Sequence, residues 1–465
     1  MRIQRPIDLD SGYSFLNRTK LTLLILHFSV ATNTKQSGEG PHHLIVERDV
    51  KKTLQIDKGD TATLISWEIK DFVPKGGNMN TYVTSVLVTY SDDDGVRKEV
   101  SYVAKLNPCR GVNYDDLARL FFTNEILFFQ THLPLINNVL ESAGQPLLRV
   151  PKFFHGCTEN GKEVMYMEDL RPRGFKVADR RAWQFMDTTY SLILHEIARL
   201  HSASWVLFKR TSPEDLSDML SQLRQVPIEG AMNAITSMMT KGVKGTIAIL
   251  EHIGGNEKAV EWLKRHSLNW SKYLWIVGES NPPFDVLKHG DVHMNNVLFR
   301  YDDKGEPVEV MLVDFQGVAV ASLSTELNYF WFHLANMARA PISSETFLEK
   351  YIESFQEVVS ESREMLSFTF SDLQKAFQDR RIVVLVFAAG LYPHCFRSGA
   401  VSGDEFWEVN EGDAQQNELK RLLTCVDNSS SLKEQMKQDF NAFEREGLFD
   451  KDVEEYIKAW TPSNK

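Results

Sequence analysis

The sequence has few cysteines, no long apolar run beyond its amino terminus and no excess of basic residues. Each of these features, if present, would indicate a particular class of protein. Its four cysteines, Cys109, Cys157, Cys395 and Cys425, lack CxxC spacing, which argues against a zinc site and a disulfide framework. Outside the amino terminus no apolar run approaches the length of about 18 residues that a membrane-spanning helix needs. Basic residues number 52 against 63 acidic ones, a net charge of -11. Nucleic acid is therefore not an expected partner, because binding its phosphates requires a concentrated basic surface.

The amino-terminal end carries one short apolar run. Arg18 and Lys20 precede this run over 21–30, which ends in Ser29-Val30-Ala31, the small-x-small pattern of a signal cleavage site. At about half the length of a spanning helix, the run is typical of a poorly ordered or interfacial extension, and secretion is the lesser alternative. We expect residues 1–41 to be an extension, and the scattered cysteines to indicate a reducing, cytoplasmic compartment.

The periodicity of the remaining sequence changes near residue 170. Before this point the sequence predicts three strands and then a helix, over 63–72, 82–90, 100–106 and 114–133. Beyond it helices dominate, over ranges that include 188–208, 370–389 and 432–446. A chain of 465 residues can form two units with a cleft between them. We predict an α+β fold with a β-rich domain over 42–170 and a mostly helical one over 171–465.

The residues with the clearest chemical content surround one predicted hairpin. Its turn is Asp302-Asp303-Lys304-Gly305, and its strands are predicted over 297–301 and 308–313. Asp291 lies before the hairpin in a His-Gly-Asp turn, Asn296 lies where the first strand begins, and Asp314 lies where the second ends. The hairpin places the last two side chains at the same end.

These three side chains match the needs of magnesium-dependent phosphoryl transfer. The Asp291 carboxylate would accept or orient the proton of a substrate hydroxyl. The amide oxygen of Asn296 and the carboxylate of Asp314 would bind Mg2+, which prefers hard oxygen ligands. Asp, Asn and Gly are also ordinary turn residues, so each motif alone carries little weight. Their combination around a hairpin predicts a phosphotransferase.

A phosphate-binding group is expected upstream. Lys105 ends the third predicted strand, where its ammonium could reach nucleotide phosphates, and Glu125 on the following helix could hold it extended. A solvated lysine and a surface glutamate are the alternative for each residue taken alone. Gly76, Gly77 and Asn78 lie where a phosphate-covering loop belongs, although they do not form a GxGxxG motif.

Three further features favour a structural interpretation. The segment from His195 to Arg199 resembles a zincin helix, but arginine replaces the second histidine, which argues against a metalloprotease. His201 is more often a hydrogen-bonded core residue than a ligand. The aromatic run Tyr329-Phe330-Trp331-Phe332 is more often core than substrate pocket.

In chain order, the motifs resemble those of the ecdysteroid kinase-like, or CHK kinase-like, proteins, relatives of choline kinases and aminoglycoside phosphotransferases. The motifs are Lys105, Phe121-x-x-x-Glu125, Glu168-Asp169-Leu170, His289-Gly290-Asp291-x-His293-x-x-Asn296 and Asp314-Phe315-Gln316. The resemblance covers residues from about 45 to about 450 and implies a protein-kinase-like fold, with a small β-rich N-lobe and a larger helical C-lobe.

The resemblance also implies a role for each motif residue. Asp291 would be the catalytic aspartate, and His289 and His293 of the same motif are expected to be catalytic residues with it. Asn296 and Asp314 would bind magnesium, Lys105 and Glu125 would form the N-lobe ion pair, and the backbone from Glu168 to Leu170 would hold the adenine of ATP. His293 stands where tryptophan is frequent in the family, and Glu326 where aspartate is frequent, so the class of acceptor stays open.

Residues and resemblance together predict a kinase that uses ATP and Mg2+ to phosphorylate a hydroxyl group of a small molecule, such as an ecdysteroid or a hydroxylated xenobiotic. A choline, ethanolamine or sugar kinase is the alternative among enzymes. A catalytically silent member that binds a hydrophobic ligand is the alternative from another class. Neither a nucleic-acid partner nor an integral membrane span is expected.

Overall fold

A computed structural model of the chain describes residues 41–71, 81–109, 112–178, 186–212, 214–215, 229–270, 273, 280–337, 342–397 and 413–460. Two predictions lie outside these residues: the amino-terminal extension up to residue 40, and the phosphate-covering loop at Gly76, Gly77 and Asn78.

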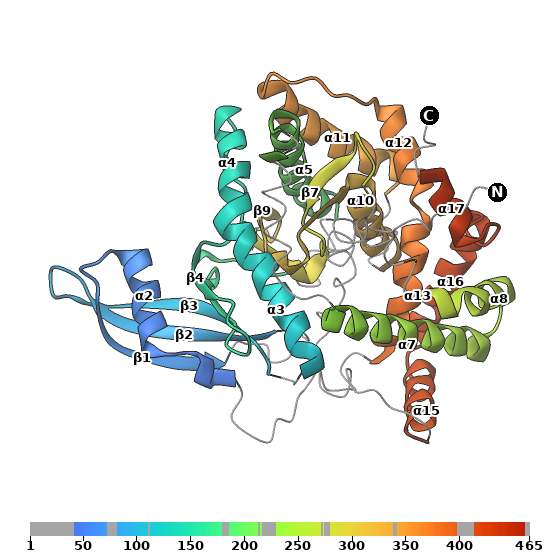
Figure 1. Cartoon of the computed structure of the whole chain (residues 1–465), viewed down its shortest axis with the longest axis horizontal. Helices are drawn as coiled ribbons and strands as arrows, with labels where there is room; N and C mark the ends of the chain where they lie inside the picture. The colour runs from blue at the N-terminus through green and yellow to red at the C-terminus, as the bar shows by residue number, and fades with distance from the viewer. Residues whose placement is uncertain are drawn as a thin grey trace, which may run out of the picture.

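An antiparallel five-stranded sheet occupies the amino-terminal part of the described chain. Its spatial order is β1-β2-β3-β5-β4, formed by β1 (Thr63–Asp71), β2 (Tyr82–Ser91), β3 (Arg97–Leu106), β4 (Phe153–Cys157) and β5 (Val164–Glu168). The three predicted strands correspond to β1, β2 and β3. Helix α2 (Glu47–Lys58), which the sequence analysis did not predict, packs on the sheet at the left of Figure 1, where its Val50 and Leu54 are fully buried.

A long helical segment lies between this sheet and the rest of the molecule (Figure 1). It consists of α3 (Val112–Leu127), a π-helical turn (Phe128–His132) and α4 (Leu133–Ser142). The sequence predicted one helix over 114–133, and the π turn inserts a wider ring of hydrogen bonds into it. The apolar face of this segment joins both parts of the chain, since Phe122 of α3 shares a core cluster with Met165 of β5 and with residues of the later helices.

Two smaller antiparallel sheets flank the segments that contain the His-Gly-Asp and Asp-Phe-Gln motifs. One pairs β7 (Asp285–Lys288) with β10 (Ala319–Ser322), and the other has the order β6-β8-β9, from β6 (Lys176–Val177), β8 (Val297–Tyr301) and β9 (Pro307–Leu312). The predicted hairpin is confirmed as β8 and β9, with Val297 opposite Leu312. The short strands β7 and β10 were not predicted.

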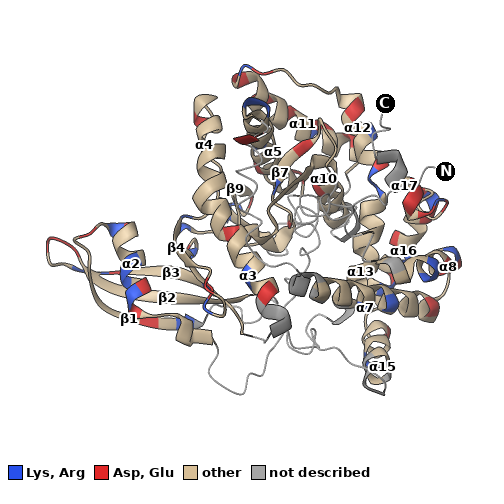
Figure 2. Cartoon of the chain, in the orientation of Figure 1, with Lys and Arg blue, Asp and Glu red and all other residues tan. Residues whose placement is uncertain are grey.

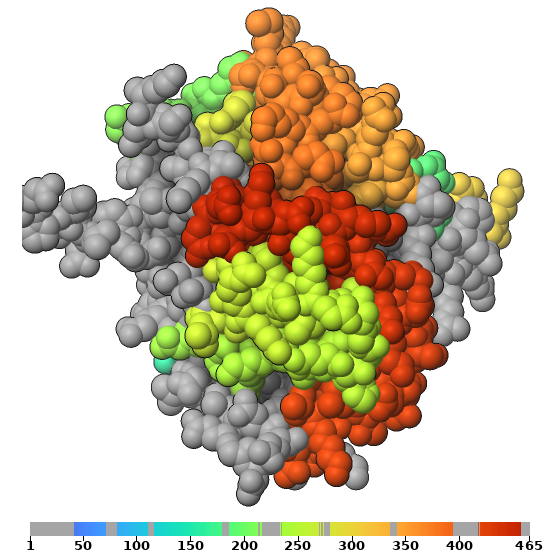
Figure 3. Space-filling view, turned by 90° about the vertical axis from the view of Figure 1, so that its right-hand side faces the viewer, coloured from blue at the N-terminus to red at the C-terminus, as the bar shows by residue number. Residues whose placement is uncertain are grey.

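The other α-helices make this a mixed α and β fold. They are α5 (Met186–Arg210), α7 (Glu229–Ile253), α8 (Glu257–His266), α10 (Leu323–Trp331), α11 (Ser344–Glu361), α12 (Phe370–Asp379), α13 (Ile382–Arg397), α15 (Asp413–Asp427), α16 (Ser430–Arg445) and α17 (Val453–Trp460). Figure 3 shows the face where residues of α7 and α8 lie among those of α15, α16 and α17.

One predicted helix is wrong in its extent. The sequence pattern over 370–389 is continuous, but the structure divides it into α12 and α13 at Arg380 and Arg381. The capping box of Thr369 and Asp372 starts α12. Arg381 then turns away to bond Glu446 through both its Nε and Nη2 atoms, each at 3.0 Å. This tertiary contact is invisible to a periodicity argument.

The surface chemistry of the described chain is mixed. Acidic and basic residues are interspersed along the helices and not collected on one element (Figure 2). Among the described helices, none has the length and apolar content needed to cross a membrane.

Candidate active site

The His-Gly-Asp turn follows directly from β7. Gly290 has φ +85, a backbone conformation that L side chains rarely adopt. A β-carbon at this position would also lie 2.0 Å from the carbonyl oxygen of Gly317. The turn can therefore press against the segment after Asp314 only with glycine at position 290.

Glu326 of α10 fixes the position of this turn through hydrogen bonds to its backbone. Its carboxylate accepts the backbone N–H groups of His289, at 3.0 Å, and of Gly290. His201 of α5 bonds the same carboxylate through Nε2 at 2.7 Å, which agrees with the interpretation of this histidine as a hydrogen-bonded core residue. Burial opposes the charge of Glu326, but His201 and neighbouring positive groups outweigh it and lower its pKa to about 2. Glu326 is thus a positioning residue that the motifs alone did not reveal.

The ring of His289 ties the turn to the end of β9. Its Nε2 lies 3.0 Å from the carbonyl oxygen of Val313, and its Nδ1 lies 3.2 Å from the backbone nitrogen of Asp291. These partners require Nε2 to donate and Nδ1 to accept, so the imidazole is neutral. Burial favours the same state, because it lowers the pKa of His289.

Three side chains surround the buried carboxylate of Asp291. The Tyr329 hydroxyl donates to Oδ1 at 2.9 Å, the Asn296 amide donates to Oδ2 at 3.0 Å, and Nε2 of His293 lies 3.3 Å from Oδ1. Burial and the nearby Asp291 charge raise the pKa of Tyr329 well above its usual value, so its hydroxyl stays a donor. The core interpretation of the aromatic run agrees with the burial of Tyr329, but it missed this contact.

Asn296 and Asp314 lie on adjacent segments. The backbone N–H of Val313 donates to the Asn296 carbonyl at 3.0 Å, which brings the two segments together. Because the Asn296 NH2 group faces Asp291, its amide oxygen is the atom a cation would use. Asp314 adopts a left-handed conformation, φ 70, at the start of the 3-10 turn Phe315–Gly317.

This donor set fits magnesium. In the part of the chain that the structure describes, no cluster of three or more His, Cys, Asp or Glu side chains could hold a metal unaided. One amide oxygen and one carboxylate are hard ligands, and Mg2+ is commonly bound by one or two carboxylates together with water and substrate phosphates. Asn296 and Asp314 can supply the protein part of such a site.

Lys105 joins the sheet to this site. Its ammonium lies 2.7 Å from Glu125 Oε2 and 2.7 Å from Asp314 Oδ1. Burial opposes its charge, but the two carboxylates outweigh it and raise the pKa of Lys105. One cation between two carboxylates leaves an excess negative charge, so burial and repulsion from Asp314 raise the pKa of Glu125 to about 6 against the attraction of Lys105.

Helix α3 also holds the Asp-Phe-Gln turn through its backbone. The N–H of Phe315 lies 3.3 Å from Glu125 Oε1, and the side-chain amide of Asn124 donates to the carbonyl of Gln316 at 3.0 Å. The position of α3 therefore controls both the lysine and the turn that carries Asp314.

A family model described as the ecdysteroid kinase-like family matches residues 75–363, a span that contains every motif residue from Lys105 to Asp314. The chain belongs to the ecdysteroid kinase-like family. This membership confirms the resemblance that the motifs predicted and points to a kinase-like phosphotransferase that uses a nucleotide. No curated protein matches the chain significantly.

In this ecdysteroid kinase-like chain, the predicted adenine-binding segment follows β5. Glu168 ends that strand, its carboxylate bonds the Lys152 backbone N–H at 3.2 Å and Arg173 at 3.1 Å, and Leu170 is buried. Strands β3 and β5 are neighbours, with Lys105 opposite Met165. The segment and the lysine therefore start from adjacent strands of one sheet.

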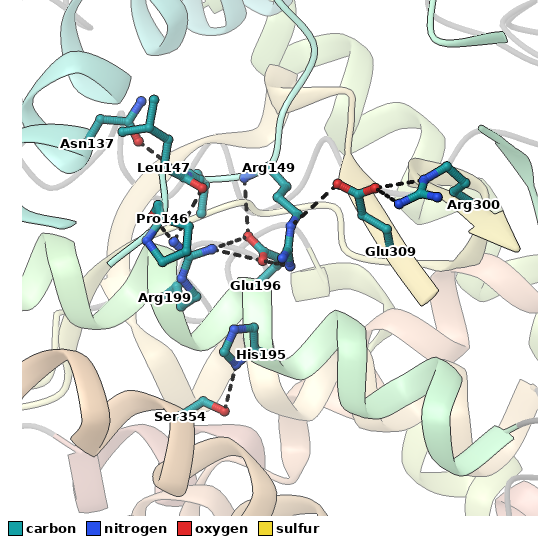
Figure 4. A network of polar contacts seen from close by, with 11 residues as sticks. Asn137, Pro146, Leu147, Arg149, His195, Glu196, Arg199, Arg300, Glu309 and Ser354 are labelled. Atoms are coloured by element: carbon teal, nitrogen blue, oxygen red, sulfur yellow. Dashed lines mark hydrogen bonds and ion pairs between the residues drawn. The ribbon is translucent and has the colours of Figure 1, made fainter. Parts of the chain in front are cut away.

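The zincin-like helix of the ecdysteroid kinase-like chain carries a different network (Figure 4). Glu196 accepts from Arg149 at 2.7 Å and from Arg199 at 2.9 Å, and His195 Nδ1 lies 3.2 Å from the Ser354 hydroxyl. Two arginines thus form ion pairs with the carboxylate that a zincin would use as a base. This agrees with the interpretation against a metalloprotease. The network instead fastens the segment before β4 to α5.

Proposed function

We propose that this protein is an ATP- and magnesium-dependent kinase that transfers the γ-phosphoryl group of ATP to a hydroxyl of a small molecule. One observation carries the proposal: Lys105 bonds both Glu125 and Asp314, and Asn296 bonds Asp291 in the adjacent turn. A phosphate-binding cation, two metal ligands and a candidate base are therefore grouped as phosphoryl transfer requires.

The proposal includes a protein-kinase-like arrangement of two lobes. The N-lobe would cover residues 42–170 and the C-lobe residues 171–465, with ATP bound between them. The backbone from Glu168 to Leu170 would contact the adenine. The loop at Gly76, Gly77 and Asn78 would cover the phosphates.

Each residue would contribute by position and charge. Bound magnesium would neutralise phosphate charge, and Asn296 and Asp314 would be its protein ligands. Lys105 would donate to phosphate oxygens, while Glu125 keeps its side chain extended. Asp291 would accept a hydrogen bond from the acceptor hydroxyl and orient that oxygen towards the γ-phosphorus.

The two histidines of the motif would act differently. His289 is neutral and buried with both ring nitrogens bonded to backbone, so it would position the turn without touching substrate. His293 is closer to the chemistry, because its Nε2 faces Asp291 Oδ1. As a donor to that oxygen it would restrict which Asp291 lone pairs face the acceptor.

Family membership is the basis for the proposed acceptor, an ecdysteroid or a hydroxylated xenobiotic. Because the reaction consumes ATP, we propose a cytoplasmic location. A choline, ethanolamine or sugar kinase would use the same phosphate site with a different acceptor pocket, and a silent member would keep the site without turnover.

The test is incubation with magnesium and ATP over a panel of steroid, amino-alcohol and sugar acceptors, with products identified by mass spectrometry. Wild-type protein should phosphorylate at least one acceptor, and Asp291→Asn should not. Asp303→Asn, the same substitution at an exposed carboxylate of the β8–β9 turn, is the matched control and should keep full activity. ATP binding without any product would favour the silent member, and neither binding nor product would contradict the proposal.

A further inference from the structure

Lys288 is an unusual residue beside the His-Gly-Asp turn. It is the last residue of β7 and is fully buried. Its ammonium has no hydrogen-bond partner within the described ranges. Burying a charged ammonium in this way is strongly unfavourable unless nearby charges compensate it. An apolar side chain of similar length would avoid that cost, so the charge itself needs an explanation.

The ammonium lies where the two motif turns meet. A β-carbon placed on Gly290 would be 3.0 Å from Lys288 Nζ and 2.0 Å from the Gly317 carbonyl oxygen. The backbone of Lys288 pairs with Ala319 of β10, two residues beyond Gly317. Lys288 is thus next to the turn that carries Asp291 and to the turn that follows Asp314.

Two carboxylates on different elements interact with the charge of this ammonium, although neither forms a hydrogen bond with it. Glu326 of α10 and Asp291 of the His-Gly-Asp turn both attract it. Burial lowers the pKa of Lys288 to about 8 against these attractions, so the side chain is mostly charged at neutral pH. His201 of α5 also contacts Glu326, with its Nε2 at 2.7 Å. His289, the neighbour of Lys288 in sequence, is neutral.

We propose that Lys288 is a positioning residue whose ammonium compensates the buried charges of Glu326 and Asp291, and so keeps the His-Gly-Asp turn seated against the turn after Asp314. Its effect on catalytic rate rests on the proposed phosphotransferase function. Lys288 would not contact substrate. It would act through Glu326, which bonds the backbone of the turn, and through the field at Asp291.

The test is a double-mutant cycle of Lys288→Met, Glu326→Gln and the double variant. Lys288→Met keeps an unbranched side chain that is one atom shorter and removes the charge. It should lower kcat by about tenfold or more while KM for ATP changes by less than about threefold. Because each single variant leaves the opposite charge uncompensated, the double variant should be faster than additivity of the two single effects predicts. Additive effects, or a wild-type kcat in Lys288→Met, would overturn the proposal.

The pH dependence of kcat provides a readout that a purely packing role would not move. Wild-type kcat should decline as the pH rises through about 8, as Lys288 loses its proton, and the Lys288→Met profile should lack this decline. A wild-type profile that stays flat through this range would also overturn the proposal, and this measurement does not depend on any variant folding.

Failure of the proposed function can be told apart from failure of this inference. If wild-type protein transfers no phosphate to any acceptor, the same cycle is measured by thermal unfolding at neutral pH. Non-additive melting temperatures of Lys288→Met and Glu326→Gln would still support the charge pairing. If the shifts in melting temperature of the two single variants add up to that of the double variant, the charge pairing of Lys288 and Glu326 is contradicted, whatever the activity.

Discussion

Asp291 and Asp314 carry the same functional group but have different partners, so their loss should have different consequences. Asp314→Ala deletes the proposed anionic magnesium ligand and should weaken magnesium-dependent ATP binding by about tenfold or more. Asp291→Asn removes the group proposed to orient the acceptor and should leave ATP affinity within about threefold of wild type while abolishing turnover. Calorimetric titration with ATP in the presence of magnesium measures both.

The control for this comparison is titration with a chelator present. Without magnesium the difference in ATP affinity between the two variants should shrink, since Asp314 then has no metal to bind. Equal losses of affinity in the presence of magnesium would contradict the separate roles of the two carboxylates.

Glu125 should make stability depend on pH. Its pKa is raised from 4.5 to about 6 in the folded protein, so the native state holds this proton more tightly than the unfolded chain does. The stabilisation is complete below about pH 4.5 and is lost as the pH rises to about 6. Relative to Glu125→Gln, wild type should lose about 2 kcal/mol of unfolding free energy over that window. Parallel stability curves for the two proteins, measured by denaturant unfolding, would argue against this.

Tyr329 should affect rate more than nucleotide binding. Tyr329→Phe removes the hydroxyl that donates to Asp291, so the carboxylate is less firmly held and kcat should fall by about tenfold, with KM for ATP unchanged. Tyr392→Phe is a matched control, because its buried hydroxyl also bonds a carboxylate, that of Asp439. A similar kcat for the two variants would contradict a specific role of the Tyr329 hydroxyl at Asp291.

Part of this site could be predicted from the sequence. Asp291, Asn296 and Asp314 surround one hairpin, so local patterns bring them together. Lys105 and Glu125 lie upstream, on a predicted strand and on the helix that follows it. The contacts of Glu326 and Tyr329 with the His-Gly-Asp turn could not be predicted this way, because they depend on how α10 packs against the turn. A weak signal existed: the two are three positions apart, on one face of a helix.

At the scale of elements, the close approach of the two motif turns is the most specific feature. Gly290→Ala should abolish activity and destabilise the protein by about 3 kcal/mol or more, because a β-carbon would lie 2.0 Å from the Gly317 carbonyl. Gly305→Ala in the β8–β9 turn is the control, since its φ is +80 and open space surrounds it. It should cost only about 1 kcal/mol from backbone strain. Thermal unfolding and activity of both variants test the difference.

Elements with strong local patterns were predicted, and those set by tertiary contacts were not. Strands β2 and β3 are ten residues long and rich in β-branched or alternating residues, which makes them visible in sequence. Strands β7 and β10 have four residues each. This is too short for the alternation of apolar and polar residues to be recognised in the sequence. The break between α12 and α13 depends on where Arg381 meets Glu446.

At the scale of the molecule, α3 connects the sheet to the helices. Its Phe122 belongs to a core that extends into α5 and α11, and its Glu125 joins Lys105 of the sheet to the Asp314 segment. A shift of α3 would therefore move Lys105 and the turn that carries Asp314 together. Family membership could be predicted from the sequence because the motifs keep a fixed order, whereas the acceptor depends on side chains that no motif specifies.

The most direct test of the central claim is transfer of label from ATP carrying 32P in the γ position to an alcohol acceptor, in parallel for wild type and Asp291→Asn. Wild-type protein should produce labelled acceptor only when magnesium is present, and Asp291→Asn should produce none although it still binds ATP. Equal labelling by both proteins, or labelling that persists without magnesium, would show that Asp291 and magnesium do not carry the reaction.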